Sequence, residues 1–202
     1  MNKYTVQLNK QELRKADFPG DFISLAEKIS ENKFFDSSKI FTVKQRRRML
    51  DVEFIEELLT IILVDVQDKK EYIDDVCEKY IILDNKEDIE QEFLGTIQDI
   101  SKIFDLKTFP IQDTRFRQKS DFYSLFACVL FLRRKGKLRI DKLEEARKQL
   151  KIMDECIGPQ SEEEEYREYA TRCLSDANSI ANRKWRIEYI QKRIEILYEI
   201  EE

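Results

Sequence analysis

Apolar residues at helical spacing recur along nearly the whole chain, and few residues interrupt them. The clearest stripe runs from Phe54 to Val66 at steps of one, three and four residues, the spacing of one helix face. Only 4 glycines and 3 prolines occur in 202 residues, whereas a sheet-rich fold needs many tight turns. The sequence therefore predicts an all-α fold, an irregular multi-helix bundle of about seven to nine helices.

Further stripes of the same kind lie in residues 72–83, 93–104, 122–130 and 187–197. Several helices are expected to begin at a capping residue or at a capping-box pair. These caps are Asn9 with Glu12, Asp51, Ser120, Asp141 with Glu144, and Ser161 with Glu164. Strand-like sequence is limited to residues 39–43 and 109–111.

One segment interrupts the helical pattern more than the others. Residues 107–120 contain Pro110 and little periodicity, which predicts a boundary between two parts of the chain. The expected organisation is either two packed helical subdomains, residues 1–110 and 111–202, or one continuous domain.

The composition excludes several kinds of catalytic site. There is no histidine, which removes histidine bases, Ser-His or Cys-His nucleophile pairs and the usual histidine-containing zinc sites. The 4 cysteines are widely spaced without a CxxC pair, which is typical of a reduced protein. No apolar run approaches the length of a membrane span. We therefore expect a cytoplasmic protein with no metal, no cofactor and no membrane contact.

Two stretches near the start resemble a known family. LNKQELRKADFPG (residues 8–20), followed by FISLAEKI, and RRRMLDVEF (residues 46–54) are similar to segments of the GmrSD-type restriction and phage-defence proteins. RFRQKSDFYSLF (residues 115–126) and a closing helix with Asn178, Asn182 and RIEIL extend the resemblance over essentially the whole chain. The positions that carry the family signature are Asn9, Gln11, Glu12, Arg14, Arg48, Asp51 and Glu53.

The resemblance implies an incomplete enzyme. In that family a ParB-like, nucleotide-hydrolysing half with an Asp-Gly-Gln-Gln-Arg element precedes this point, and the present sequence contains neither that element nor a glycine-rich phosphate loop. The implied function is a helical accessory or regulatory part that has no catalytic activity of its own. Its expected partners are the nucleotide-hydrolysing half or a second copy of itself, with DNA as a further contact.

The residues alone leave other functions open. The signature positions could simply hold helix ends in place, and the chain could be a free-standing adaptor for a protein partner or a small DNA-binding regulator. Several apolar side chains near the start are expected to lie exposed until a partner covers them. These are Tyr4, Val6, Leu8, Phe18, Phe22, Phe34 and Phe35.

Clusters of cations are the candidates for contact with nucleic acid. The net charge of −5 requires any such contact to come from local patches. Clusters that converge on one face would track phosphates, whereas cations at a helix end also complement the helix dipole. The candidate residues are Arg46, Arg47, Arg48, Arg115, Arg117, Arg133, Arg134, Lys135, Arg183 and Arg186.

Overall fold

The computed structural model describes residues 7–69, 71–105 and 107–200, and within them the chain is built from eleven α helices and one short strand pair. The all-α prediction is confirmed, since nine of these helices have seven or more residues. The helices are α1 (Lys10–Asp17), α2 (Asp21–Ser30), α3 (Lys33–Ser37), α4 (Val43–Arg47), α5 (Leu50–Leu63), α6 (Ile73–Lys79), α7 (Lys86–Ile103), α8 (Lys119–Lys135), α9 (Leu143–Cys156), α10 (Glu164–Leu174) and α11 (Ile180–Ile194). The strands are β1 (Gly136–Leu138) and β2 (Tyr198–Ile200), and four single-turn 3-10 helices complete the chain: η1 (Ile111–Asp113), η2 (Arg115–Arg117), η3 (Ile140–Lys142) and η4 (Glu195–Leu197).

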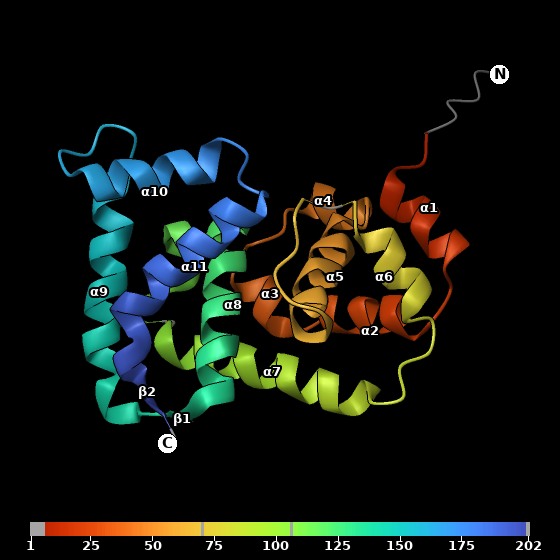
Figure 1. The fold of residues 1–202 in the computed structure, drawn as a ribbon, viewed down its shortest axis with the longest axis horizontal. Coiled ribbons are helices and arrows are strands. Elements are labelled where there is room, and N and C mark those ends of the chain that lie inside the picture. Colours follow the sequence, from red (N-terminus) through yellow and green to blue (C-terminus); the bar gives the residue numbers. More distant parts are fainter. Residues whose placement is uncertain (1–6, 70, 106, 201–202) are drawn as a thin grey trace.

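Helices α7 and α8 join two groups of elements. Figure 1 shows α1 to α6 on one side and α9 to α11 on the other, with α7 running along the lower edge. Helix α8 packs against α11, α7 and α5. The buried apolar residues form one continuous cluster that includes both groups. The proposed boundary after residue 110 falls between α7 and α8, and the division into two subdomains stays a prediction.

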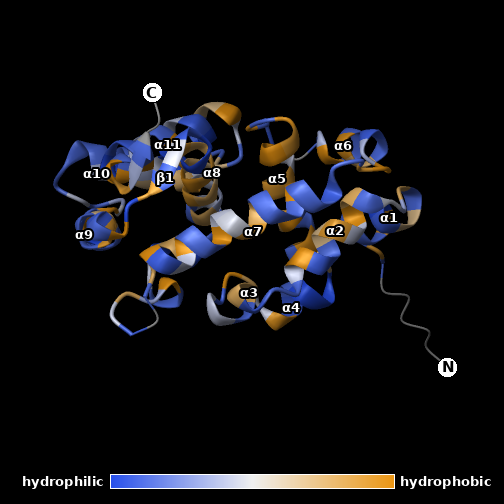
Figure 2. Ribbon diagram, turned by 90° about the horizontal axis from the view of Figure 1, so that it is seen from below, coloured by the Kyte–Doolittle hydropathy of each residue, from blue (hydrophilic) through white to orange (hydrophobic). Residues whose placement is uncertain are grey.

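Helix α8 has the longest uninterrupted run of buried residues among the described helices. Every residue from Asp121 to Leu130 is buried, and so is Leu132. A helix buried around its whole circumference needs apolar residues on all sides. Figure 2 accordingly shows the ribbons of α8 and α5 mostly in the hydrophobic colour, whereas α9 and α10 at the edge are mixed. The core is therefore built around α8.

The expected helix caps are only partly correct. The Asn9–Glu12 capping box is confirmed, since Asn9 Oδ1 accepts from the Glu12 N–H at 2.9 Å and Glu12 Oε2 accepts from the Asn9 N–H at 2.7 Å. Asp51 is not the cap of α5, because Met49 takes that position in a left-handed conformation with φ of 53°. Helix α4 ends directly before it, and the left-handed residue reverses the chain.

Three further cap predictions are wrong because the helices begin elsewhere. Helix α8 begins at Lys119, which places Ser120 inside its first turn. The Asp141 carboxylate accepts from the Arg139 guanidinium at 3.0 Å, and a 3-10 turn precedes α9. Helix α10 begins at Glu164 with Glu163 at its N-cap, so Ser161 lies too early to cap it.

The expected strands are also wrong. Residues 39–42 form an irregular segment with Lys39 in the left-handed region, Val43 begins α4, and Ile111 opens the 3-10 helix η1. The strand pair joins β1 to β2 in antiparallel register, with Lys137 opposite Glu199. This pairing connects segments about sixty residues apart in the sequence, which is why local strand propensity did not reveal it.

Most of the apolar residues expected to be exposed near the start are inside the protein. Phe22 and Phe35 are both 1% exposed, and Phe18 and Phe34 are partly buried against the core. Only Leu8 is strongly exposed, at 56%. Tyr4 and Val6 lie outside the described residues. The start of the chain thus covers its own core to a larger extent than the sequence suggested.

Gly20 gives a direct test of how the loop before α7 packs on α2. A Cβ at Gly20 would lie 2.5 Å from the Ile81 carbonyl oxygen, while a Cβ at Gly158 would meet no atom within 4 Å. Gly20→Ala should therefore lower the free energy of unfolding by about 1–3 kcal/mol through overpacking. Urea denaturation followed by circular dichroism measures the change, and Gly158→Ala is the control, expected to be neutral or slightly stabilising. Equal stability of the two variants would contradict this packing.

Candidate functional site

Residues of the family signature meet where α1 crosses the start of α5. The Asn9 side chain donates to the Arg48 carbonyl oxygen at 2.8 Å, and the Arg48 guanidinium lies 3.3 Å from Glu12. Arg48 also donates to the Gln7 carbonyl oxygen at 3.0 Å. The structure therefore brings together the two sequence stretches that carry the resemblance.

A second, buried set of contacts anchors α1 on α5 and α6. Gln11 donates to Glu56 Oε1 at 2.5 Å, and Arg14 lies 3.3 Å from Glu56 Oε2. Arg14 also donates to the Gln11 side chain, and to Asp74 at 2.6 Å. The buried residues of α1 are only these two polar ones, Gln11 and Arg14. Polar pairing rather than apolar packing thus holds α1 in place.

Glu56 carries the strongest electrostatic perturbation in this cluster. Its side chain is fully buried, and this burial raises the pKa of Glu56 to about 8, against the opposite effect of Arg14 and Gln11. The neighbouring Cys77 thiol is also buried, and burial raises its pKa. A protonated thiol is a poor nucleophile, so the pair offers no reactive cysteine.

The remaining signature residues lie at the start of α5. Asp51 is buried and lies 3.5 Å from the Arg46 guanidinium, which also pairs with Asp36 at 2.9 Å. Glu53 is half-buried in the first turn of the same helix. These carboxylates sit where the positive end of the helix dipole favours them. Both residues thus have a local structural explanation at the start of α5.

Most of the arginines proposed to contact nucleic acid are paired inside the molecule. Arg133 lies 2.9 Å from Asp99, and Arg134 lies 2.7 Å from Glu92. Arg115 pairs with the buried Asp121 at 3.2 Å. Among the ten candidates, Arg47, Arg117 and Lys135 are the exposed cations with no ion pair to the described residues.

Arg183 and Arg186 are not surface residues. Each is 1% exposed, so neither side chain can form part of an external phosphate-tracking patch in this conformation. Arg183 donates to Glu57 at 2.5 Å, and Arg186 donates to Ser124 at 3.0 Å. The sequence interpretation placed both among the nucleic-acid contacts, and this burial corrects it.

The cationic clusters converge only in part. Arg46 and Lys119, which follows Arg115 and Arg117 in the sequence, both lie over the ring of Phe41, at 5.5 and 5.2 Å. The basic stretch 46–48 therefore meets the basic stretch 115–119 there. Arg133 lies at the other end of α8, about 20 Å away along a helix that rises 1.5 Å per residue. A single nucleic-acid face containing both Arg46 and Arg133 is therefore not supported.

The acidic partners of these arginines are the residues that sequence reasoning missed. Most of them lie far from their arginine in the sequence: 42 positions separate Arg14 from Glu56, and 126 separate Arg183 from Glu57. Asp121 is the exception, six positions after Arg115. One available signal was a carboxylate inside an otherwise apolar helix stripe, as at Glu56 and Glu57 in α5. The missed partners are Glu56, Glu57, Asp74, Glu92, Asp99 and Asp121.

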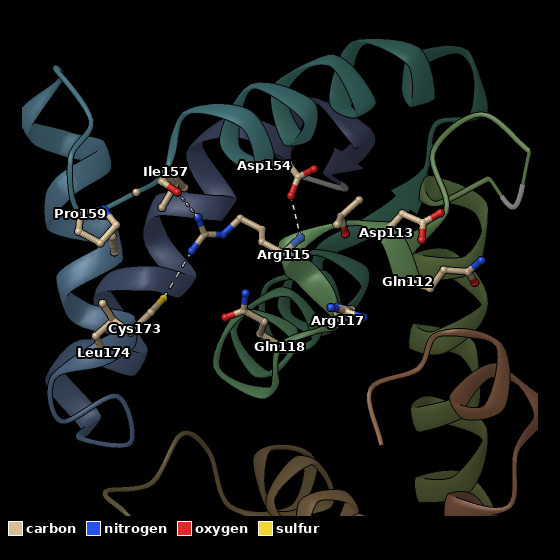
Figure 3. Close-up of a pocket in the computed structure, with 13 residues that line it drawn as sticks. Gln112, Asp113, Arg115, Arg117, Gln118, Asp154, Ile157, Pro159, Cys173 and Leu174 are labelled. Carbon is tan, nitrogen blue, oxygen red and sulfur yellow. Dashed lines mark hydrogen bonds between the residues drawn. The ribbon is translucent and has the colours of Figure 1, made fainter. Parts of the chain in front are cut away.

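A polar pocket of about 670 Å³ lies between η2, α9 and α10 (Figure 3). The Arg115 side chain crosses it and donates to the Ile157 carbonyl oxygen at 2.9 Å, while the Arg115 backbone N–H donates to Asp154 at 2.7 Å. Cys173 lies 3.9 Å from the same guanidinium. The volume is that of a small-molecule site, and Arg117 is the one lining cation without an ion pair to the described residues.

The pocket does not assemble a catalytic set. Burial raises the pKa of the Cys173 thiol to about 11, so it stays protonated at neutral pH. Burial also raises the pKa of Asp121, against the effect of Arg115. In the described part of the chain no three Cys, Asp or Glu residues are placed to hold a metal ion. Nor is any described helix long and apolar enough to cross a membrane.

Comparisons with models of protein families, with curated proteins and with solved structures found no match to this chain. The GmrSD resemblance therefore rests on the quoted sequence stretches and stays a hypothesis.

Glu56 predicts a pH dependence of stability. The folded protein holds the Glu56 proton more tightly than the unfolded chain, since its pKa is about 8 instead of 4.5. The free energy of unfolding should therefore fall as pH rises from about 4.5 to about 8. Glu56→Gln should remove most of this fall, measured by urea denaturation at several pH values. Glu31→Gln, at an exposed carboxylate, is the control, and an unchanged slope in Glu56→Gln would contradict the assignment.

Proposed function

We propose that this chain is a non-catalytic helical accessory part of a GmrSD-type defence system and packs on a nucleotide-hydrolysing partner. The observation that carries the proposal is the convergence of Asn9, Glu12 and Arg48, from two separate stretches of the resemblance, at one junction. The same junction includes the α1 anchor on Glu56. If the role of this chain is to present α1 to a partner protein, its signature residues are expected to hold α1 firmly against α5.

Helix α1 has the surface that such a partner would need. The polar side chains of its inner face are already hydrogen-bonded to Glu56 and Asp74. On the outside, Leu13 is 46% exposed, and Leu8, just before the helix, is 56% exposed. Apolar side chains held outward on an anchored helix favour contact with another protein. A free-standing adaptor would use the same surface and would differ only in its partner. Contact with DNA is a secondary part of the proposal and would depend on Arg47 and Arg117.

The docking role predicts a specific effect of Leu13. Leu13→Glu should abolish binding to a separately expressed half that contains Asp-Gly-Gln-Gln-Arg and is encoded beside this chain, because it places a charge in the apolar contact. Size-exclusion chromatography with light scattering measures the complex. Leu174→Glu, which changes a more exposed leucine at the end of α10, is the matched control. Equal binding by both variants, or no binding by the unchanged chain, would refute docking through α1.

The accessory role also predicts that the purified chain does not hydrolyse nucleoside triphosphates. The sequence has no phosphate loop. The Cys173 thiol lies 3.7 Å from the Asp121 carboxylate, but burial raises the pKa of this thiol to about 11, which keeps it protonated at neutral pH. A phosphate-release assay with ATP and GTP should stay at the level of the blank. Steady turnover that a single substitution such as Glu56→Gln removes would contradict the proposal.

A further inference from the structure

Arg186 is a buried cation without an ion-pair partner in the described part of the chain. It is 1% exposed, and its guanidinium donates to the Ser124 hydroxyl at 3.0 Å and to the Arg172 and Ala177 carbonyl oxygens at 2.5 and 2.8 Å. All three acceptors are neutral. A buried charge is costly unless an opposite charge compensates it. The buried Asp121 carboxylate acts on Arg186 electrostatically, but it already pairs with Arg115 at 3.2 Å. No carboxylate of the described residues therefore lies at ion-pair distance from Arg186.

A small cavity of about 80 Å³ opens beside this guanidinium. Its charged lining consists of three cations, Lys119, Arg183 and Arg186, and one carboxylate, Glu57, which leaves an excess of two positive charges. Glu57 already accepts from Arg183 at 2.5 Å. The volume suits a few waters or one tetrahedral oxyanion.

The N-terminus of α8 adds to the positive potential of the cavity. Lys119 and Ser120, the first two residues of this seventeen-residue helix, line the cavity, and Gln118 at the N-cap makes no side-chain capping bond. The first N–H groups of a helix and its dipole favour an anion at this end. The helix N-terminus and the cationic side chains thus both favour an anion in the cavity.

An unpaired hydroxyl supplies a further donor. Tyr123 lines the cavity and is 2% exposed, yet its hydroxyl makes no hydrogen bond with any described residue. The Arg183 guanidinium, which also lines the cavity, lies 4.1 Å from the centre of the Tyr123 ring. Buried hydroxyls are nearly always paired, so this one points to a missing acceptor.

We infer that the cavity binds a phosphate-type oxyanion, either free phosphate or the phosphate of a small monoester. The anion would compensate the charge of Arg186 and accept from Tyr123, with Lys119 at its side. It would connect α11 to the start of α8 and to α5, which carries Glu57. This role is independent of partner docking through α1, because none of the cavity residues belongs to α1.

Isothermal titration of the full chain with inorganic phosphate, at constant ionic strength set by chloride, tests the inference. We expect one saturable site and a matching rise in the melting temperature that chloride does not produce. A parallel titration with adenosine 5′-monophosphate identifies the source, since tighter binding of the ester indicates a nucleotide and tighter binding of phosphate indicates the free ion. Absence of saturable binding of both would overturn the inference.

Two variants and one control locate the site. Lys119→Met keeps the apolar stem against Phe41 and Phe54 and should weaken phosphate binding about tenfold or more. Tyr123→Phe keeps the ring and should weaken binding about three- to tenfold, which decides the question if Lys119→Met fails to fold. Lys184→Met removes one exposed cation from α11 and should bind phosphate as the unchanged chain does. Phosphate affinity that is unaffected by Tyr123→Phe, or lowered equally by Lys184→Met, would overturn the assignment.

Discussion

The burial of α8 on all sides is the constraint on which the rest of the structure depends. Ten consecutive residues of this helix are inaccessible to solvent, so α5, α7 and α11 must each present an apolar face to it. The clustered rings of Phe54, Phe122 and Phe126 show how closely these faces meet. Removing one large core side chain of this kind typically costs several kcal/mol, which makes the position of α8 the determinant of the other helices.

A buried helix still has two polar ends, and the charged residues of this protein are arranged around them. At the start of α8, Asp121 forms an ion pair with Arg115, and the Ser124 hydroxyl accepts a hydrogen bond from Arg186. At its end, Arg133 reaches Asp99 and Arg134 reaches Glu92. These pairs satisfy groups that would otherwise be buried without partners. In the same arrangement, the hydrogen-bond acceptors of Arg186 are a hydroxyl and two carbonyl oxygens, and no described carboxylate forms an ion pair with it. The inferred anion site follows from this uncompensated positive charge.

The candidate sites could be predicted from the sequence only in part. Asn9 and Glu12 form the expected capping box, because such a box depends only on the local geometry of two residues three positions apart. The contact of Asn9 with Arg48 spans 39 positions, and the sequence did not predict it. The arginines at 183 and 186 lie in a basic stretch that is typical of a surface, yet both turn inward. The direction of a long side chain depends on partners that local sequence does not contain.

The sequence by itself determined that the fold is all-α and where most of the longer helices lie, because hydrophobic periodicity and the scarcity of glycine and proline act within one or two turns of the chain. Only the tertiary structure decided which carboxylate meets which arginine, where β1 finds β2, and that Met49 rather than Asp51 begins α5. Each of these depends on contacts between segments that are distant in sequence or on the chain reversal between two packed helices. Such contacts exist only in the packed arrangement of the helices around α8.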